Sequence, residues 1–224
     1  MKRRARAPSP TGRGDVVSSL VLCFPLLLAY EIGVLFTGRV SGADVITRAL
    51  YATTGSRTAY LLLHALVAVG FLAWMQWTHR WLSLRASVAA PVILEASLYA
   101  LTLGAAISLV LTRALGLGAG GDIVSAIGAG VHEELVFRLL AMYLIVRALA
   151  RIARPGPAVG IALATSALLF AAAHHLGAHG EPFTMHAFVF RALAGAAFGA
   201  IFWFRSLAHA VYAHVLYDVL VALT

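Results

Sequence analysis

The sequence predicts an all-α fold, a bundle of about seven transmembrane helices, on three observations. First, 61% of the 224 residues are hydrophobic and only 12% are charged, whereas soluble domains carry about 25% charged residues. Second, apolar runs of about 20 residues, the length that crosses the hydrocarbon core of a bilayer, recur along the chain. Third, basic residues gather at the ends of these runs. The chain is therefore expected to be an integral membrane protein.

A basic segment precedes the first apolar run. Residues 1–15 combine five Lys and Arg residues with proline and glycine, a composition typical of a disordered tail. The run Val16–Phe36 follows directly. No persuasive small-x-small cleavage site follows this run, so we expect a retained membrane anchor rather than a signal peptide.

Six further spans are predicted from hydropathy: Thr58–Trp77, Val88–Leu111, Ile123–Leu149, Val159–His175, Phe183–Phe204 and Leu207–Leu223. Glycine and proline are expected to separate them, since both residues interrupt helices. We place Gly116 to Gly121 before the fourth span, Pro155 to Pro157 before the fifth and Pro182 before the sixth. The last two spans are separated only by Arg205 and Ser206.

Charge and cysteine content exclude several classes of function. The formal net charge is +8, but the basic residues lie at loop ends and form no aromatic-lined stripe, so no nucleic-acid partner is expected. With the N-terminus in the cytoplasm, most of the 17 Lys and Arg residues fall on the inner side, as the positive-inside rule requires. The single cysteine, Cys23, allows no intrachain disulfide.

The fourth predicted span contains an unusual group of polar residues, His132, Glu133, Glu134 and Arg138. A charged group at this depth costs on the order of 2.5 to 3.5 kcal/mol and marks a candidate functional site. Glu134 and Arg138 are four residues apart, which places them on one helix face as an ion pair. Glu133 is turned about 100° away from Glu134. We therefore expect Glu134 to be structural and Glu133 to be available for chemistry.

Two later spans also carry polar residues. The fifth ends in His174 and His175, and the seventh contains His214 and Asp218, four residues apart and so on one face. Adjacent histidines cannot both face one point on a helix, so at most one of His174 and His175 belongs to a shared site. Polar groups on three spans are difficult to explain by packing alone.

These residues form four motifs in order: Glu133-Glu134-x-x-x-Arg138, Phe170-x-x-x-His174, Gly195-x-x-x-Gly199 and His214-x-x-x-Asp218. The series resembles the CPBP family, which comprises CAAX prenyl endopeptidases and bacterial relatives linked to bacteriocin processing and immunity. The resemblance implies an intramembrane protease with a catalytic core at 122–224. Residues 16–121 would then form a variable set of N-terminal helices, preceded by the cytoplasmic tail 1–15.

The resemblance also implies a role for each site residue. Glu133 would be the general base, and Glu134 would be an orienting residue held by Arg138. His174 and His214 would hold the attacking water and polarise the scissile carbonyl. Asp218 occupies the position of an oxyanion-stabilising group, but the family most often has asparagine there. Asp218 therefore either carries a proton or orients His214.

Two mechanisms remain open on the sequence. A metal-free, glutamate-type mechanism is favoured, with no cofactor. The alternative is zinc bound by Glu133, His174 and His214, since two histidines and one carboxylate can hold this ion with a water. The zinc motif His-Glu-x-x-His is absent, because Val136 follows where the second histidine would stand.

The expected partners are the lipid bilayer and a membrane-anchored protein or peptide, cleaved near its membrane-embedded or C-terminal part. No oligomeric state follows from the sequence. The richness in arginine and alanine favours a bacterial inner membrane. Two other functions are compatible with these residues. A proton-coupled transporter could use the same buried groups, but the chain has no inverted repeat. A catalytically silent member could bind a peptide and confer immunity.

Overall fold

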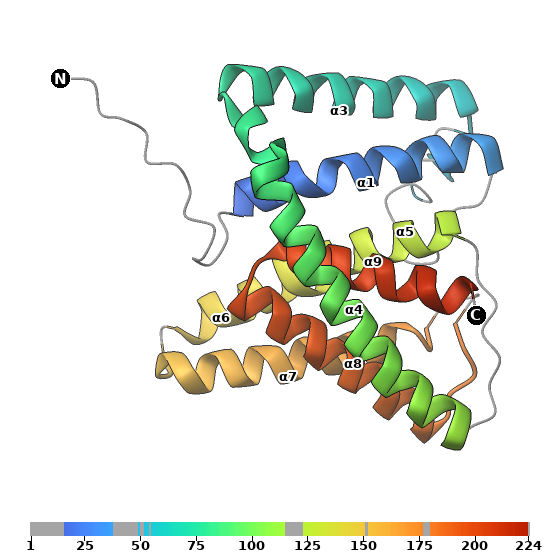
Figure 1. Ribbon diagram of the computed structural model, residues 1–224, viewed down its shortest axis with the longest axis vertical. Coiled ribbons are helices and arrows are strands. Elements are labelled where there is room, and N and C mark those ends of the chain that lie inside the picture. Colours follow the sequence, from blue (N-terminus) through green and yellow to red (C-terminus); the bar gives the residue numbers. More distant parts are fainter. Residues whose placement is uncertain are drawn as a thin grey trace.

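A computed structural model describes residues 16–37, 49, 52–53, 55–114, 123–150, 152–176 and 180–223. The predicted tail, 1–15, lies outside this part. All regular elements within these ranges are helices (Figure 1), which confirms the predicted fold class. Five of them are long and apolar enough to cross a membrane: Val16–Thr37, Thr58–Trp77, Ala86–Leu103, Pro155–Ala173 and Met185–Phe204.

The N-terminal helices are α1 (Val16–Thr37), α3 (Arg57–Trp77) and α4 (Ala86–Ala114), with a short 3₁₀ helix, η1 (Arg80–Leu84), before α4. In Figure 1, α1 and α3 run side by side and α4 crosses the bundle obliquely. Ser56 caps α3, because its hydroxyl accepts a hydrogen bond from the amide of Ala59. These helices lie where the sequence predicts the first three spans.

The predicted fourth span is a helix in three parts. It comprises α5 (Ile123–Glu133), a π-helical segment η2 (Glu134–Met142) and α6 (Tyr143–Leu149). Segments of π-helix are rare in proteins, and those that occur are frequently found at functional sites. The carbonyl of Phe137, inside η2, accepts a hydrogen bond from the Ser166 hydroxyl over 2.7 Å. Such a side-chain donor compensates for the altered backbone pairing of an irregular turn in lipid.

The C-terminal helices are α7 (Pro155–Ala173), α8 (Met185–Phe204) and α9 (Leu207–Leu223). The prediction that Pro155 to Pro157 precede the fifth span was wrong, because α7 begins at Pro155 itself. Proline fits the first turn of a helix, where its missing N–H has no intrahelical partner. The short link at Arg205 and Ser206 does separate α8 from α9, although α9, at 17 residues, is short for a span.

Close packing of the C-terminal helices depends on glycine. A Cβ atom on Gly130 in α5 would lie 2.8 Å from the backbone nitrogen of Val215 in α9. A Cβ atom on Gly195 in α8 would lie 3.1 Å from the Cα atom of Ala167 in α7. Gly199 has only ordinary contacts. The small-residue motif of the sixth span therefore permits the approach of α7 through one of its two glycines.

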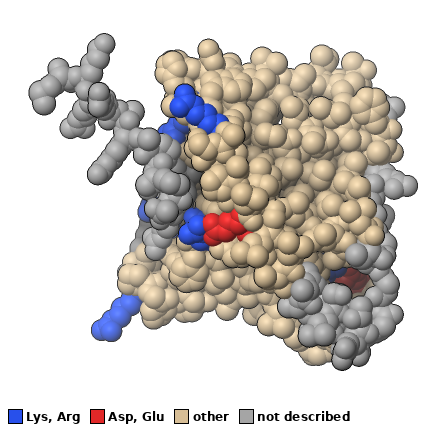
Figure 2. All heavy atoms as spheres, in the orientation of Figure 1, with Lys and Arg blue, Asp and Glu red and all other residues tan. Residues whose placement is uncertain are grey.

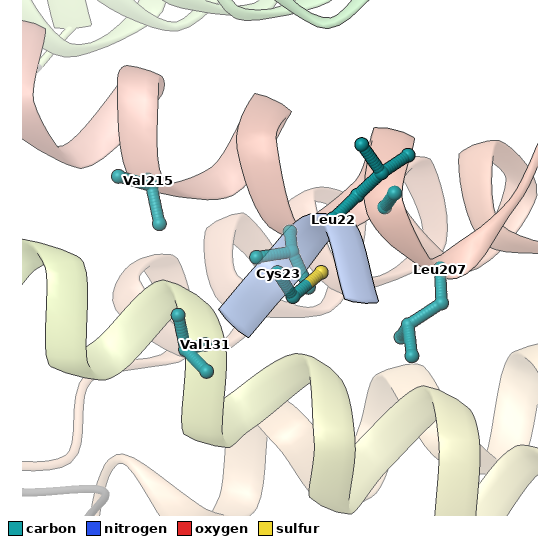
Figure 3. Close-up of a cluster of buried hydrophobic side chains, with 7 residues drawn as sticks. Leu22, Cys23, Val131, Leu207 and Val215 are labelled. Carbon is teal, nitrogen blue, oxygen red and sulfur yellow. The ribbon is translucent and has the colours of Figure 1, made fainter. Parts of the chain in front are cut away.

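An apolar cluster joins α1, α5 and α9 (Figure 3). Leu22 and Cys23 of α1 meet Val131 of α5 and both Leu207 and Val215 of α9, and all five side chains are buried. This cluster packs α5 against α9 through Val131 and Val215, which are adjacent in the sequence to His132 and His214.

The outer surface is largely apolar. Figure 2 shows one face, on which few side chains are charged and most of the basic ones lie toward one side. Leu62, Leu66 and Leu94 are 68%, 69% and 70% exposed. A surface of this kind suits contact with lipid, in agreement with an integral membrane protein.

Candidate active site

Four predicted site residues, from α5, α9 and the end of α7, converge within the bundle. The Oε1 atom of Glu133 lies 3.7 Å from Nε2 of His174, and its Oε2 atom lies 3.7 Å from Nε2 of His214. The Oδ2 atom of Asp218 lies 3.4 Å from the same Nε2 atom of His214. The Glu133 carboxylate thus lies between two imidazoles contributed by different helices.

Glu134 and Arg138 form the ion pair that their spacing predicts. Oε2 of Glu134 lies 3.1 Å from Nε of Arg138, and both side chains are 0% exposed. Arg138 also donates a hydrogen bond from Nη2 to the carbonyl of Gly195 over 3.0 Å. Its guanidinium carbon lies 4.5 Å from the ring centre of Phe170 and 5.8 Å from that of Phe198, a cation–π arrangement. Arg138 therefore links the π-helical segment to α7 and α8.

Glu134 also orients one of the catalytic candidates. Its Oε1 atom accepts a hydrogen bond from Nδ1 of His214 over 2.8 Å. The ring of Phe198 stacks on the same imidazole, with centroids 4.3 Å apart and planes 15° apart. The Glu134 carboxylate thus joins Arg138 to His214. The His214 ring is held at Nδ1 by Glu134 and on its face by the ring of Phe198.

Hydrogen bonding fixes the tautomers of both histidines. Nδ1 of His174 lies 2.8 Å from the carbonyl of Phe170, which can only accept, so Nδ1 carries the hydrogen. His214 likewise donates from Nδ1 to Glu134. In the neutral form each ring therefore has its lone pair on Nε2, the atom that faces Glu133. Both imidazoles present the same nitrogen to one carboxylate.

Two neighbouring histidines point elsewhere. His175 donates from Nδ1 to the carbonyl of Glu181 over 3.1 Å, and its ring contacts Phe183. His132 donates from Nδ1 to the carbonyl of Gly128 over 2.8 Å and meets the ring of Tyr30 edge-on. Of the adjacent pair His174 and His175, only the first lies beside Glu133.

The site is largely buried, and two of its side chains are partly exposed. The side chains of His214 and Glu133 are 4% and 10% exposed, whereas those of His174 and Asp218 are 17% and 23% exposed. The Oε2 atom of Glu133 is buried and has no hydrogen-bond partner within the described residues. An acceptor of this kind, beside two oriented imidazoles, can take a proton from a small molecule bound between them.

The donor types in this group also suit zinc. Two Nε2 atoms and a carboxylate are common zinc ligands, and a hydrogen bond from each Nδ1 is the usual support for a ligating histidine. Within the described ranges, however, no group of three or more His, Cys, Asp and Glu side chains lies close enough to form a metal site. The chemistry of the donors nevertheless fits zinc.

Sequence reasoning missed several residues that support the site. Ser166 stabilises η2, and Phe198 covers His214. In the sequence they are only a polar and an aromatic residue within apolar helices, so nothing there indicates these roles. Phe170 and Gly195 belong to the motifs, yet their contacts with Arg138 follow only from the fold. These contacts join residues far apart in the chain.

A comparison with protein families gives a match in the C-terminal part of the chain. Residues 121–220 match a family model described as type II CAAX prenyl endopeptidase Rce1-like. This range contains every residue of the converging group. Searches of curated proteins and of solved structures found no match.

Proposed function

We propose that Glu133 activates the water that cleaves the substrate. The match of residues 121–220 to the type II CAAX prenyl endopeptidase Rce1-like family, a family of proteases, supports this and agrees with the CPBP resemblance. The substrate would be a membrane-anchored protein or peptide, cut near its membrane-embedded or C-terminal part. One observation carries this proposal: the Glu133 carboxylate lies 3.7 Å from the Nε2 atoms of both His174 and His214.

These distances suit a water between the three groups. A separation of 3.7 Å is too long for a direct hydrogen bond. A water that bridges these groups would therefore lie beside the line that joins them rather than on it. Oε2 of Glu133 is a buried acceptor without a partner in the described part of the chain. A water donating to Glu133 and to Nε2 of His174 would be held with its oxygen lone pair directed at a peptide carbonyl.

The proposed reaction proceeds in two steps. Glu133 takes a proton from the water as the water oxygen bonds to the carbonyl carbon of the scissile peptide. The oxyanion that forms accepts a hydrogen bond from Nε2 of His214, which carries a hydrogen when this imidazole is protonated. The carbon–nitrogen bond then breaks, and Glu133 returns its proton to the leaving amine. The sum is the addition of one water across one peptide bond.

In this mechanism Asp218 and Glu134 position His214. Glu134 holds its Nδ1 edge, and Asp218 lies beside Nε2. Aspartate in place of the family's usual asparagine is thus proposed to orient the imidazole rather than to bind the oxyanion.

A zinc-dependent version is the second candidate, and it is favoured by the shared direction of the two Nε2 atoms. It would use Glu133, His174 and His214 as ligands, and the metal would supply an activated water. Removal of metal separates the two mechanisms. Hydrolysis that persists after treatment with a strong chelator supports the metal-free mechanism, whereas loss that is reversed by added zinc supports the alternative.

The test of the proposal is cleavage of membrane-protein tails by the purified chain in detergent. Mass spectrometry of C-termini in cells with and without the chain would identify a substrate, and the corresponding peptide would then be used in vitro. Cleavage that depends on Glu133 supports the proposal. Peptide binding without cleavage would indicate the immunity role instead, and proton-coupled flux without cleavage would indicate transport.

The chain is an integral membrane protein, and we propose a cytoplasmic N-terminus in a bacterial inner membrane. The excess of arginine on the predicted inner segments supports this orientation. A reporter that is active only in the cytoplasm, fused before residue 16, would test it; an inactive fusion that is stably produced would reverse the assignment.

A further inference from the structure

The turn between α3 and α4 presents aromatic and basic side chains on the outside of the bundle. Trp77, the last residue of α3, is 83% exposed, and Trp81 and Leu82 of η1 are 41% and 51% exposed. Arg85 follows η1 directly and is also exposed. We call these four residues the α3–α4 turn. None of them belongs to the candidate active site.

The inner side of η1 is packed into the bundle. Ser83 is buried, and its hydroxyl donates a hydrogen bond to that of Ser18 in α1 over 3.2 Å. Leu84 packs against the apolar cluster that joins α1, α5 and α9. Because these contacts fix one side of η1, Trp81 and Leu82 are held on its other side, facing outward.

The charge of Arg85 is not balanced within the described part of the chain. Its side chain forms no hydrogen bond or ion pair there, and neither η1 nor the first turn of α4 contains an acidic residue. By contrast, Arg205 in the link between α8 and α9 pairs with Glu95. An exposed guanidinium without a carboxylate retains its donors for an external anion.

The α3–α4 turn lies where the chain is expected to leave the hydrocarbon core. The apolar segment Thr58–Trp77, which is long enough to cross a membrane, ends at its first residue. In Figure 1 the turn lies at the same end of the bundle as the start of α1 and the link between α8 and α9. Most basic side chains in Figure 2, which has the same orientation, lie toward this end. Tryptophan rings favour the headgroup level of a bilayer, and arginine side chains extend from there to the phosphates.

We propose that the α3–α4 turn binds the headgroup of an anionic phospholipid. The guanidinium of Arg85 donates to the phosphate, which it can bind through two parallel hydrogen bonds. The rings of Trp77 and Trp81 lie at the boundary between headgroup and acyl chains. An anionic lipid is favoured over a zwitterionic one because no ammonium group cancels its negative charge. A lipid bound here restrains α1 as well, through Ser83, whether or not the chain hydrolyses peptides.

The test is the binding of lipid to the purified full chain in a neutral detergent, measured by native mass spectrometry. Phosphatidylglycerol and phosphatidylcholine with the same acyl chains are titrated separately. The wild-type chain is expected to bind phosphatidylglycerol at least roughly fivefold more tightly, the effect of one cation beside an anionic lipid. Arg85→Gln should remove most of this preference, and Arg85→Lys should retain part of it. Equal affinities of the wild-type chain for the two lipids would overturn the proposal.

Arg154→Gln is the matched control. Arg154 is likewise an exposed arginine directly before a helix, α7, but its link contains no tryptophan. This variant should keep the wild-type preference. Equal losses in Arg85→Gln and Arg154→Gln would indicate a diffuse attraction to the basic end of the bundle rather than a site, and would overturn the proposal.

Lipids with brominated acyl chains locate the bound molecule, because bromine quenches indole fluorescence on contact. In phosphatidylcholine vesicles, a fixed fraction of brominated phosphatidylglycerol should quench the wild-type chain more than the same fraction of brominated phosphatidylcholine. Arg85→Gln should abolish this excess. The double variant Trp77→Phe/Trp81→Phe should abolish it too, since only Trp74 and Trp203 remain; an excess that survives would overturn the proposal.

Inorganic phosphate separates a lipid site from a site for small anions. Sodium phosphate should displace phosphatidylglycerol no better than sodium chloride does at equal ionic strength, because it makes no contact with the tryptophan rings. Displacement specific to phosphate would assign Arg85 to a soluble anion and would overturn the role of the lipid.

Discussion

In two glutamate–histidine pairs outside the candidate active site, the carboxylate lies closer to the imidazole than Glu133 lies to either of its histidines. Glu31 lies 3.5 Å from His64, and Glu95 lies 3.4 Å from His209, whereas Glu133 lies 3.7 Å from each of its histidines. Proximity of an acid to an imidazole therefore does not distinguish a site of chemistry in this molecule.

The carboxylates differ in what else they bind. Glu31 accepts a hydrogen bond from Tyr60, and Glu95 accepts from Tyr99 and pairs with Arg205. Their side chains are 14% and 26% exposed. Glu133 is 10% exposed, and its Oε2 atom has no hydrogen-bond partner within the described ranges. A carboxylate whose oxygens are occupied by donors holds helices together, whereas one with a free buried oxygen can accept a proton.

Replacement of the three glutamates tests this comparison most strongly. Glu133→Gln is expected to lower kcat by roughly 10² to 10⁴, the usual contribution of a general base. Glu31→Gln and Glu95→Gln should change kcat only a few-fold. The measurement is peptide hydrolysis by purified variants with equal elution profiles. Similar losses in all three would mean that the outer pairs share the catalytic role.

Removal of the buried arginine should mainly affect stability. Arg138→Ala leaves the carboxylate of Glu134 buried without its cation, which costs about 3 to 5 kcal/mol. Arg205→Ala is the control, because its pair with Glu95 is partly exposed and such pairs contribute about 1 kcal/mol or less. Thermal unfolding in detergent measures both. Equal destabilisation would remove the distinction between the inner and outer ion pairs.

Substitutions of the two adjacent histidines should have different effects on kcat in the same hydrolysis assay. His174→Ala is expected to lower kcat by about 10² or more, since a group within reach of the reacting water is lost. His175→Ala should leave kcat within a few-fold, because this ring contacts Phe183 and the backbone of Glu181. The reverse order would place His175, not His174, at the reacting bond.

The smallest expected effect concerns the π-helical segment. Ser166→Ala removes the hydroxyl that donates to the carbonyl of Phe137 and should destabilise the fold by about 1 kcal/mol. Ser97→Ala is the matched control, since that hydroxyl bonds within its own exposed helix turn. No difference in unfolding temperature between the two variants would mean that η2 does not depend on α7.

Much of the fold follows from local rules that the sequence displays. Hydropathy located the long helices of the described ranges to within a few residues, but it did not predict the short helix η1. The i, i+4 rule gave the pair of Glu134 and Arg138. The start of α7 was misplaced because Pro155 breaks a helix in its interior but suits its first turn.

The parts that the sequence could not predict depend on contacts between distant residues. Nothing in residues 134–142 indicates a π-helix, which is completed by Ser166 on another helix. Likewise, the link from Glu134 to His214 joins residues 80 positions apart, and helix-face reasoning on either segment alone does not reveal it. The motifs suggested which side chains lie in one site, whereas the hydrogen bonds between these side chains are seen only in the structure.

Gly130 has a consequence for how the reacting groups keep their spacing. At this residue α5 approaches the main chain of α9 so closely that a methyl group would collide with the backbone of Val215, next to His214. The distance between Glu133 on α5 and the His214 imidazole on α9 is thus limited by main-chain atoms, which cannot adjust by changing rotamer. Even alanine at this position would act as a wedge and push His214 away from Glu133, so a substitution that adds only one carbon and two hydrogens would lower activity without touching any polar side chain.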